Sequence, residues 1–139
     1  MTPDELADLH ALCFTTPRPW KATEFADLLD MRGVFLITQG RGMIMGRVIA
    51  DEVELLTLAV HPDERRSGAG RALVEAFMTR ATELGATTAF LEVAAPNAAA
   101  IALYEVTGFE TTGTRPGYYR TPDGQTQNAR IMCRDLGRR

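Results

Sequence analysis

Apolar residues recur along this chain with two different spacings, and the spacings predict its helices and strands. In residues 3–13, Leu6, Leu9 and Leu12 are spaced so that they fall on one side of a helix. A similar apolar stripe predicts a second helix over residues 20–31. A loop with two prolines separates the two segments, so we expect two distinct helices at the start of the fold.

Shorter apolar runs follow, and they predict three strands joined by tight turns. The runs cover residues 34–38, 43–50 and 53–60. The first connection contains two glycines, which suit the positive φ angles of a hairpin turn. Gly46, inside the second run, is a candidate β-bulge. Because the connections are short, we expect the three strands to pair in antiparallel fashion.

The second half of the chain alternates between helical and strand patterns. In order, these patterns predict a helix over 71–84, a strand over 87–94, a helix over 97–106, and strands over 109–114 and 130–136. A polar loop containing prolines and glycines is expected over residues 115–129. A strand, a crossover helix and a second strand in succession predict one parallel strand pair.

The predicted element order is therefore ααβββαβαββ, which indicates an α+β fold. We expect a mixed, mostly antiparallel sheet with a central parallel strand pair, flanked by helices. The chain of 139 residues has the apolar content of an ordinary globular protein, and we expect a single domain over residues 1–139.

Composition and charge narrow the classes of function. The net charge of −3 opposes non-specific binding to nucleic acid. No apolar run approaches the ~18 residues that a membrane span needs, and the acidic N-terminus does not resemble a signal peptide. We therefore expect a cytoplasmic protein without direct nucleic-acid or membrane partners. Cys13 and Cys133 lack the spacing of metal ligands, so we expect no metal site and two thiols, with a disulfide as the alternative.

The clearest chemical signal lies in residues 61–71, between a predicted strand and a predicted helix. This stretch contains Gly68, Gly70 and three arginines. The unpaired N–H groups and the dipole at the start of a helix attract anions, and glycine lets an anion approach the backbone. Arginine adds charge-assisted hydrogen bonds to phosphate oxygens. We therefore predict a pyrophosphate-binding site, whose ligand these residues alone do not identify.

Ordered motifs along the chain resemble those of the GNAT superfamily of acetyl-CoA-dependent N-acetyltransferases. The cofactor motif of that superfamily, Arg/Gln-x-x-Gly-x-Gly/Ala, occurs here as Arg65-Arg66-Ser67-Gly68-Ala69-Gly70. Within the superfamily the chain is most similar to RimI-type enzymes, which acetylate the N-terminal α-amino group of a ribosomal protein. The segments that carry this similarity are Pro19-Trp20, Leu91-Glu92-Val93, Asn97 to Glu105, Gly108-Phe109 and Gly117-Tyr118-Tyr119.

The resemblance implies the GNAT fold and an acetyl-CoA-dependent N-acetyltransferase. It implies direct transfer from acetyl-CoA to a primary amine in a ternary complex, with the N-terminal α-amino group of a ribosomal protein as the expected acceptor. A small-molecule amine as acceptor and a non-catalytic CoA-binding module are the alternatives. The expected partners are acetyl-CoA and an acceptor peptide or small amine, and we expect a monomer or a weak dimer.

The resemblance also implies roles for individual residues. Glu92 corresponds to the general base, and Tyr104, near the sulfur of the cosubstrate, to the general acid. The residues that it implies in contact with acetyl-CoA are Leu58, Ala59, Val60, Arg65, Arg66, Ser67, Gly68, Ala69, Gly70, Arg71, Asn97 and Tyr104.

Elementary chemistry supports these roles. An α-amino group has a pKa near ~8, so most of it is protonated at neutral pH and must lose a proton before it attacks. A carboxylate within an apolar strand is costly unless it is paired or functional, which favours Glu92 as the base over a solvent-facing position. A backbone N–H near residues 58–60 can stabilise the oxyanion. The hydroxyl of Tyr104 can protonate the leaving thiolate, although a helix tyrosine can also simply pack its ring.

Other residues have ordinary structural interpretations. We expect His10 on a helix surface and Trp20 in the core. Tyr118 and Tyr119 either anchor a loop or border a peptide groove. RimI-type enzymes usually carry an arginine directly after Leu-Glu-Val, where Ala94 stands here, so we expect the acceptor site to differ from theirs.

Overall fold

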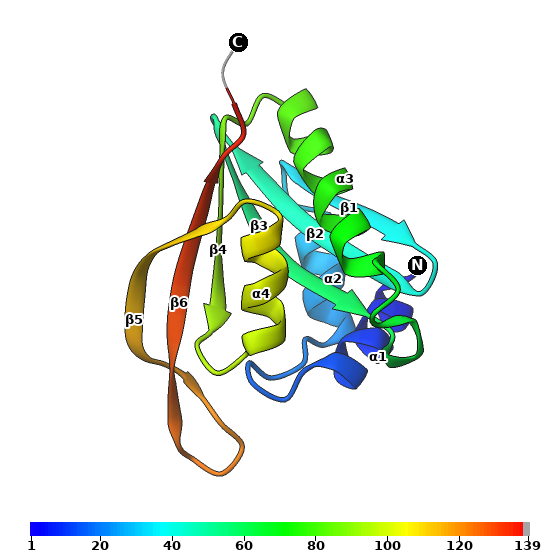
Figure 1. The fold of residues 1–139 in the computed structure, drawn as a ribbon. Coiled ribbons are helices and arrows are strands. Elements are labelled where there is room, and N and C mark those ends of the chain that lie inside the picture. The colour runs from blue at the N-terminus through cyan, green and yellow to red at the C-terminus, as the bar shows by residue number, and fades with distance from the viewer. Residues whose placement is uncertain (138–139) are drawn as a thin grey trace.

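The computed structural model describes residues 1–137 and has the predicted order of elements. The helices are α1 (Pro3–Cys13), α2 (Ala22–Leu29), α3 (Ala69–Glu83) and α4 (Ala98–Val106), with a short 3-10 helix η1 (Pro62–Glu64). The strands are β1 (Val34–Gln39), β2 (Gly42–Ile49), β3 (Glu52–Val60), β4 (Thr88–Ala94), β5 (Glu110–Arg120) and β6 (Thr126–Asp135). In Figure 1 the strands form one twisted sheet, with α3 and α4 in front of it and α1 and α2 behind.

The sheet is mixed, as predicted. Its strand order is β1-β2-β3-β4-β6-β5, and every neighbouring pair is antiparallel except β3 and β4, which run parallel. The parallel pairing is brief, because it joins only Glu52–Glu54 to Thr88–Phe90. Both strands continue past these residues, β3 to Val60 and β4 to Ala94, so they part from one another within the sheet.

An apolar core lies on each face of the sheet. Phe77 of α3 packs in one core, and Phe25 of α2 packs in the other. Because helices cover both faces, the central strands have few polar positions. The consecutive residues Met43, Ile44 and Met45 of β2 are all fully buried, and they contribute to both cores in turn.

The predicted bulge at Gly46 is present. The register between β2 and β3 shifts between Met45 and Gly46. Two aromatic rings occupy the space beside the glycine: a Cβ added there would lie 2.4 Å from Phe77 and 2.8 Å from Phe35. Gly46 is therefore needed because core aromatic side chains fill the space of a side chain.

The prediction of a polar loop over residues 115–129 is wrong. Most of this segment belongs to β5 and β6, which form a long hairpin projecting from the sheet (Figure 1). β5 is an edge strand, and its pairing with β6 is irregular between Arg115 and Tyr119, the stretch that contains Pro116. Proline is tolerated at such a position because an edge strand with a bulge does not need every N–H for its ladder.

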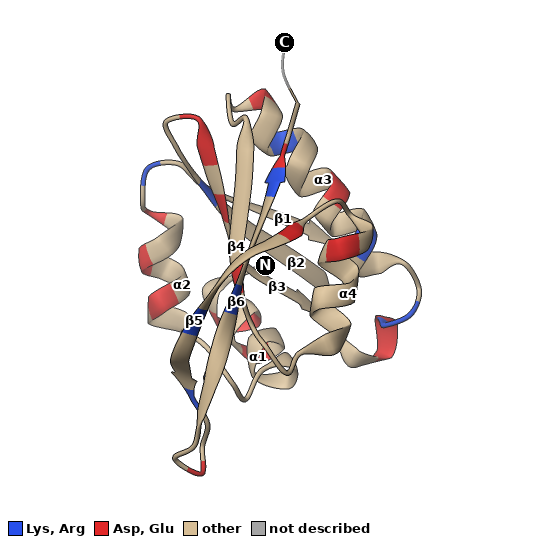
Figure 2. Cartoon of the chain, turned by 60° about the vertical axis from the view of Figure 1, so that its left-hand side comes forward, with Lys and Arg blue, Asp and Glu red and all other residues tan. Residues whose placement is uncertain are grey.

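The charged residues are dispersed over the surface. In the view of Figure 2, acidic segments lie on α2 and basic segments on β5 and β6, without one continuous basic face. None of the helices in residues 1–137 has both the length and the apolar character needed to cross a bilayer. Within the same residues, no group of three or more His, Cys, Asp and Glu side chains is arranged to hold a metal ion.

Filling the bulge should destabilise the protein. We expect Gly46→Ala to lower the free energy of unfolding by about 1–3 kcal/mol, because the new methyl group overpacks the core against two rings. Gly113→Ala in β5 is the matched control, since its methyl group would meet only Ile131, at an ordinary 3.5 Å. Urea unfolding of both variants measures the difference. Equal stabilities would show that the core around Phe77 can relax.

Candidate functional site

The parting of β3 and β4 creates a cavity in the middle of the sheet, which we call the fork cavity. Its volume is about 270 Å³. Residues 54–58 of β3 line one side, and residues 91–94 of β4 line the other, with the start of α4 beside them. Since the strands do not pair with each other here, the backbone N–H and C=O groups on their facing edges can serve a ligand instead.

Glu92 lines the fork cavity from β4, and its side chain is 20% exposed. The Nε atom of Arg115 lies 2.6 Å from Oε2 of Glu92, so the two side chains form an ion pair across the sheet. The two side chains attract each other by charge, but the N–H of Arg115 is not aligned for a hydrogen bond. Oε2 of Glu92 is buried and accepts no hydrogen bond from the described residues. This oxygen therefore retains the capacity to accept a hydrogen bond from a bound molecule.

Tyr104 reaches the same cavity from α4. Its side chain is buried, and its ring packs edge-on against Phe109 with the centroids 5.8 Å apart. Burial raises the pKa of the phenol well above its ordinary value, and Tyr119 adds to the effect. A phenol is protonated at neutral pH even with its ordinary pKa, and the raised pKa makes this hydroxyl a weaker acid. The fold thus places Glu92 and Tyr104 around one cavity.

Glu54 is a cavity residue that the sequence analysis did not single out. It occupies the last position at which β3 pairs with β4. Burial raises the pKa of its carboxyl, and the charge of Glu92 raises it further, while Arg47 and Arg115 oppose the shift. Glu54 could have been found from the sequence, because it is a carboxylate inside an apolar strand, the same signal that drew attention to Glu92.

The predicted surface position of His10 is wrong. The side chain is only 1% exposed, lines the fork cavity and stacks on Phe14 at 4.2 Å between ring centroids. Its Nδ1 accepts a hydrogen bond from the backbone N–H of Trp20 at 3.0 Å, and its Nε2 lies 2.9 Å from Oγ1 of Thr57. Since Nδ1 is an acceptor, the neutral ring carries its proton on Nε2 and donates it to Thr57. Trp20 packs against the α1–α2 core, as predicted.

The turn after β3 has the geometry of an anion site. Gly68 is the N-cap of α3 and has a φ of +83°. The first hydrogen bond of the helix runs from the amide of Ala72 to the carbonyl of Gly68, at 3.0 Å, so the three preceding amides lie outside the helical ladder. A Cβ added at Gly68 would meet nothing within 4 Å, whereas one at Gly70 would lie 3.2 Å from Leu103. Gly68 therefore supplies the backbone conformation, and Gly70 permits close packing against α4.

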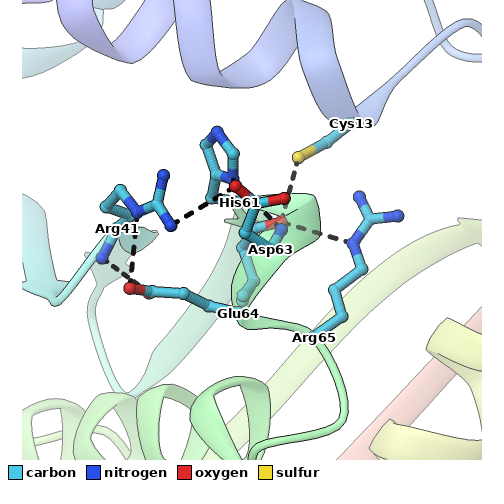
Figure 3. A network of polar contacts seen from close by, with 7 residues as sticks. Cys13, Arg41, His61, Asp63, Glu64 and Arg65 are labelled. Carbon is cyan, nitrogen blue, oxygen red and sulfur yellow. Dashed lines mark hydrogen bonds and ion pairs between the residues drawn. The ribbon is translucent and has the colours of Figure 1, made fainter.

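A polar network holds the start of this turn against the β1–β2 hairpin (Figure 3). The backbone amide of Arg41 donates a hydrogen bond to Oε1 of Glu64 at 2.8 Å. The side-chain Nε of Arg41 lies 3.5 Å from Oε2 of the same carboxylate. The amide of Asp63 donates to Nδ1 of His61 at 3.1 Å. The side chain of His61 therefore helps to hold the shape of the turn.

The three arginines of the turn differ in their surroundings. Arg65 donates from Nε to the carbonyl of Val60 at 3.3 Å, and Sγ of Cys13 contacts the same carbonyl at 3.4 Å (Figure 3). Arg71 pairs at 3.5 Å with an acidic residue one helical turn further on. Arg66 has a φ of +64°, and its guanidinium forms no hydrogen bond or ion pair within residues 1–137. Arg66 is therefore the arginine of this turn that is available to an anion.

The other residues predicted to contact a cosubstrate have mixed positions. Asn97 caps α4, since its Oδ1 accepts from the amide of Ala100 at 3.1 Å, and it also lines the fork cavity. Leu58 lines the cavity, whereas the side chain of Ala59 is buried in the α1–α2 core. Ser67 donates to a carbonyl of the turn at 2.5 Å and so stabilises its shape.

The fork cavity opens into a wide surface groove between the α1–α2 loop and the β5–β6 hairpin. The groove has a volume of about 800 Å³. Four residues line both spaces: Phe14 and Pro17 of the loop, and Tyr118 and Tyr119 of β5. The two tyrosines therefore border the groove, which was one of their two predicted positions. Through the groove, a molecule can reach Glu92 from solvent.

Comparisons with known proteins show which family and which solved structures the chain is similar to. A family model described as "Acetyltransferase (GNAT) family" matches residues 4–109. The [Ribosomal protein bS18]-alanine N-acetyltransferase of Escherichia coli K12 is 42% identical over 119 residues, which cover 83% of this chain and 80% of that protein. The crystal structure of the ribosomal-protein-S18-alanine N-acetyltransferase from Escherichia coli has a TM-score of 0.87 at 32% identity, over 99% of this chain and 89% of that one. Ard1 from Thermoplasma volcanium has a TM-score of 0.81 at 26% identity, over 99% and 95% of the two chains.

Burial of His10 should make stability depend on pH. Burial lowers the pKa of His10 from 6.5 to about 4, so between these values the unfolded chain binds a proton that the folded protein does not. The His10 contribution to the free energy of unfolding should therefore fall by about 2 kcal/mol between pH 7 and pH 5.

His10→Asn is the matched variant, because its amide oxygen can still accept from the backbone of Trp20 but does not titrate in this range. Urea unfolding of both proteins at several pH values isolates the His10 contribution as the difference between their pH dependences. Parallel curves would contradict a buried neutral imidazole.

Proposed function

The chain belongs to the GNAT family of acetyltransferases, and from this premise we propose that it acetylates the N-terminal α-amino group of a protein. Acetyltransferases of this family use acetyl-CoA as the acetyl donor. The Escherichia coli relative is named for its action on an alanine of ribosomal protein bS18. A ribosomal protein with an N-terminal alanine is therefore the first acceptor to test.

The observation that carries this proposal is the continuity of the fork cavity with the open groove. A peptide needs an open path for its chain and a narrow end for its terminal amine. Here the groove between the α1–α2 loop and the hairpin leads inward to Glu92, past Tyr118 and Tyr119. A small amine would be held better by a closed pocket, so the open groove favours a peptide acceptor.

The turn before α3 fits the pyrophosphate of acetyl-CoA. We propose that residues 65–71 bind it, with the free amides at the helix start and the guanidinium of Arg66 as the principal donors. Between the fork and this turn lies the end of β3, Leu58–Val60. Its edge is not paired with β4 and can hold an extended part of the same molecule. Asn97, which caps α4 beside the cavity, completes the proposed contacts.

Glu92 is the proposed general base. An acceptor α-amine enters mostly as an ammonium ion, and Oε2 of Glu92 is positioned to accept its proton, directly or through one water molecule. The neutral amine then attacks the thioester carbon. A backbone N–H on the open edge of β3 can stabilise the resulting oxyanion, since that edge is not satisfied by β4.

Tyr104 is the proposed general acid. As the carbon–sulfur bond breaks, the thiolate needs a proton, and the proposed donor is the hydroxyl of Tyr104, which lines the cavity and is protonated at neutral pH. No covalent enzyme intermediate is required, since the amine attacks the acetyl group directly. The chain then contributes orientation as well as proton transfer, because both reactants meet in one cavity.

Removing either proposed proton-transfer group should slow turnover. We expect Glu92→Gln and Tyr104→Phe each to lower kcat by about 10²–10⁴-fold, while the Kd for acetyl-CoA stays within about twofold. Thiol release with an alanine-starting peptide measures turnover, and calorimetry measures binding. Full activity in either variant would remove that residue from the mechanism.

The identity of the acceptor is tested in the same assay. Peptides starting with alanine or serine are compared with a panel of small amines, including polyamines, amino acids and aminoglycosides. A preference for a small amine would support the alternative of a small-molecule acetyltransferase. Tight binding of acetyl-CoA without thiol release from any amine would support a non-catalytic CoA-binding module.

Arg66→Gly separates anion binding from fold stability. Glycine adopts the φ of +64° without strain, so we expect the free energy of unfolding to stay the same or to rise slightly. Loss of the guanidinium should weaken acetyl-CoA binding by about 10-fold, the value of one charge-assisted hydrogen bond. Calorimetry and urea unfolding measure the two effects. Unchanged affinity would show that the backbone amides alone hold the anion.

A further inference from the structure

The contact between Glu92 and Arg115 is the shortest ion pair among the described residues, at 2.6 Å. It lies where the fork cavity meets the hairpin, and it involves the carboxylate proposed as the base. Arg115 is also the residue at which the regular pairing of β5 with β6 breaks off. The role of this arginine follows from the charge of the molecule that must approach Glu92.

The acceptor amine arrives as a cation, and the position beside Glu92 that it must reach is already occupied by the cation of Arg115. An α-ammonium group must come within hydrogen-bond distance of Glu92 to lose its proton. In the structure, the guanidinium of Arg115 holds that position against Oε2. An ammonium that is to give its proton to Oε2 must therefore displace the guanidinium from this oxygen.

The arginine is the partner that can move. Its side chain is 56% exposed, against 20% for Glu92, and the contact lacks an aligned hydrogen bond. A second site for the guanidinium is already in contact, because its central carbon lies 5.2 Å from the centre of the Tyr118 ring. A cation over an aromatic face retains part of its stabilisation, so the guanidinium can leave Glu92 without becoming fully solvated.

The charge balance of the cavity favours an exchange over a simple addition. Glu54 and Glu92 approach each other closely enough for the charge of Glu92 to raise the pKa of Glu54, and Arg47 and Arg115 lower it. An entering ammonium adds a positive charge beside these groups, and departure of Arg115 removes one.

We propose that Arg115 is an exchangeable counter-ion: it occupies the ammonium position on Glu92 in the free enzyme and moves onto Tyr118 when the acceptor binds. This inference rests on the proposed function of the site. In the free enzyme the arginine compensates the charge of Glu92. It also makes the position selective for cations, because a neutral molecule gains too little from Glu92 to displace a guanidinium.

The same exchange resets the base. An ammonium loses two protons in becoming an amide: one replaces the proton that Tyr104 gives to the thiolate, and the other must leave the site. The amide product is neutral, so it does not hold the carboxylate. The remaining proton passes from Glu92 to solvent, and the Arg115 guanidinium returns to the carboxylate.

The exchange can be observed without turnover. The side-chain Nε–H signal of Arg115 is assigned by its absence in Arg115→Lys and followed by NMR while methylammonium is added to the protein. We expect the signal to move toward its position in Glu92→Gln, where the ion pair is absent. Tetramethylammonium, a cation without N–H donors, should leave it in place. An Arg115 signal that is the same in wild type and in Glu92→Gln would overturn the proposal.

Peptides extend the test to the expected acceptor. An alanine-starting peptide with a free amine should displace Arg115, whereas the same peptide with an acetylated N-terminus should not. If the free peptide fails to bind while methylammonium still displaces Arg115, the proposed acceptor is wrong and the exchange stands. Binding of the free peptide with an unmoved Arg115 signal would overturn the exchange alone.

Kinetics distinguish a counter-ion from a residue that binds the acceptor. Arg115→Ala should lower the KM for the acceptor peptide about 3- to 10-fold, because a competing cation is gone.

Two further variants complete the kinetic test. Arg115→Lys should behave like the wild type, since lysine restores a cation. Arg80→Ala on α3 removes an arginine of similar exposure, 54%, from an ion pair far from the fork and should leave the KM unchanged. A raised KM in Arg115→Ala would show that Arg115 binds the acceptor, and the proposal would be wrong.

Discussion

Only three paired positions hold β3 to β4, and both proposed proton-transfer groups, Glu92 and Tyr104, line the cavity that opens where that pairing stops. Each strand follows its other neighbour beyond this point. β4 stays paired with β6 along its whole length, through Ala94, while β3 stays with β2 past the bulge at Gly46. A bulge bends and twists its strand pair, so it directs β2 and β3 away from the line of β4. The aromatic rings that require a glycine there therefore help to open the fork.

Without apolar packing on its inner side, the fork cavity would be open to water from both sides. His10 closes that side: it ties α1 to Thr57 of β3 and to the loop before α2, and it is surrounded by aromatic rings. The resulting low polarity favours the neutral form of several titratable groups. Burial lowers the pKa of His10 and raises the pKa values of Tyr104, Tyr119 and Glu54. In such surroundings each charge around Glu92 has a larger effect than it would have in water.

The sequence predicted those features that have a local signal. The helices followed from apolar spacing, and the bulge at Gly46 followed from a glycine inside an apolar run, although the rings that require this glycine come from β1 and α3. The parallel pair followed from the strand–helix–strand order, and the acetyltransferase family from ordered motifs. His10 could not be placed in this way, because its partners come from the next loop and from β3.

The hairpin and the Glu92–Arg115 ion pair were missed for the same physical reason. β5 is polar and contains a proline, so its strand character depends on pairing with β6 rather than on its own pattern. Arg115 reaches Glu92 across an intervening strand: Ile131 of β6 pairs with Glu92 on one side and with Gly113 of β5 on the other. No spacing along the chain encodes a contact that depends on the register of three strands.

The position of the cation relative to Glu92 then determines how it can act. An arginine directly after Leu-Glu-Val, the position noted above as usual in RimI-type enzymes, would lie on β4 two residues from Glu92, on a central strand paired along its length. Alternation along a strand would place it on the same face, where it would be a fixed partner of the carboxylate. Here Ala94 occupies that position and is buried. The cation comes instead from an exposed edge strand, at a break in its ladder and beside an aromatic ring. A counter-ion supplied from such a place can be exchanged for a substrate, which a counter-ion on the central strand cannot.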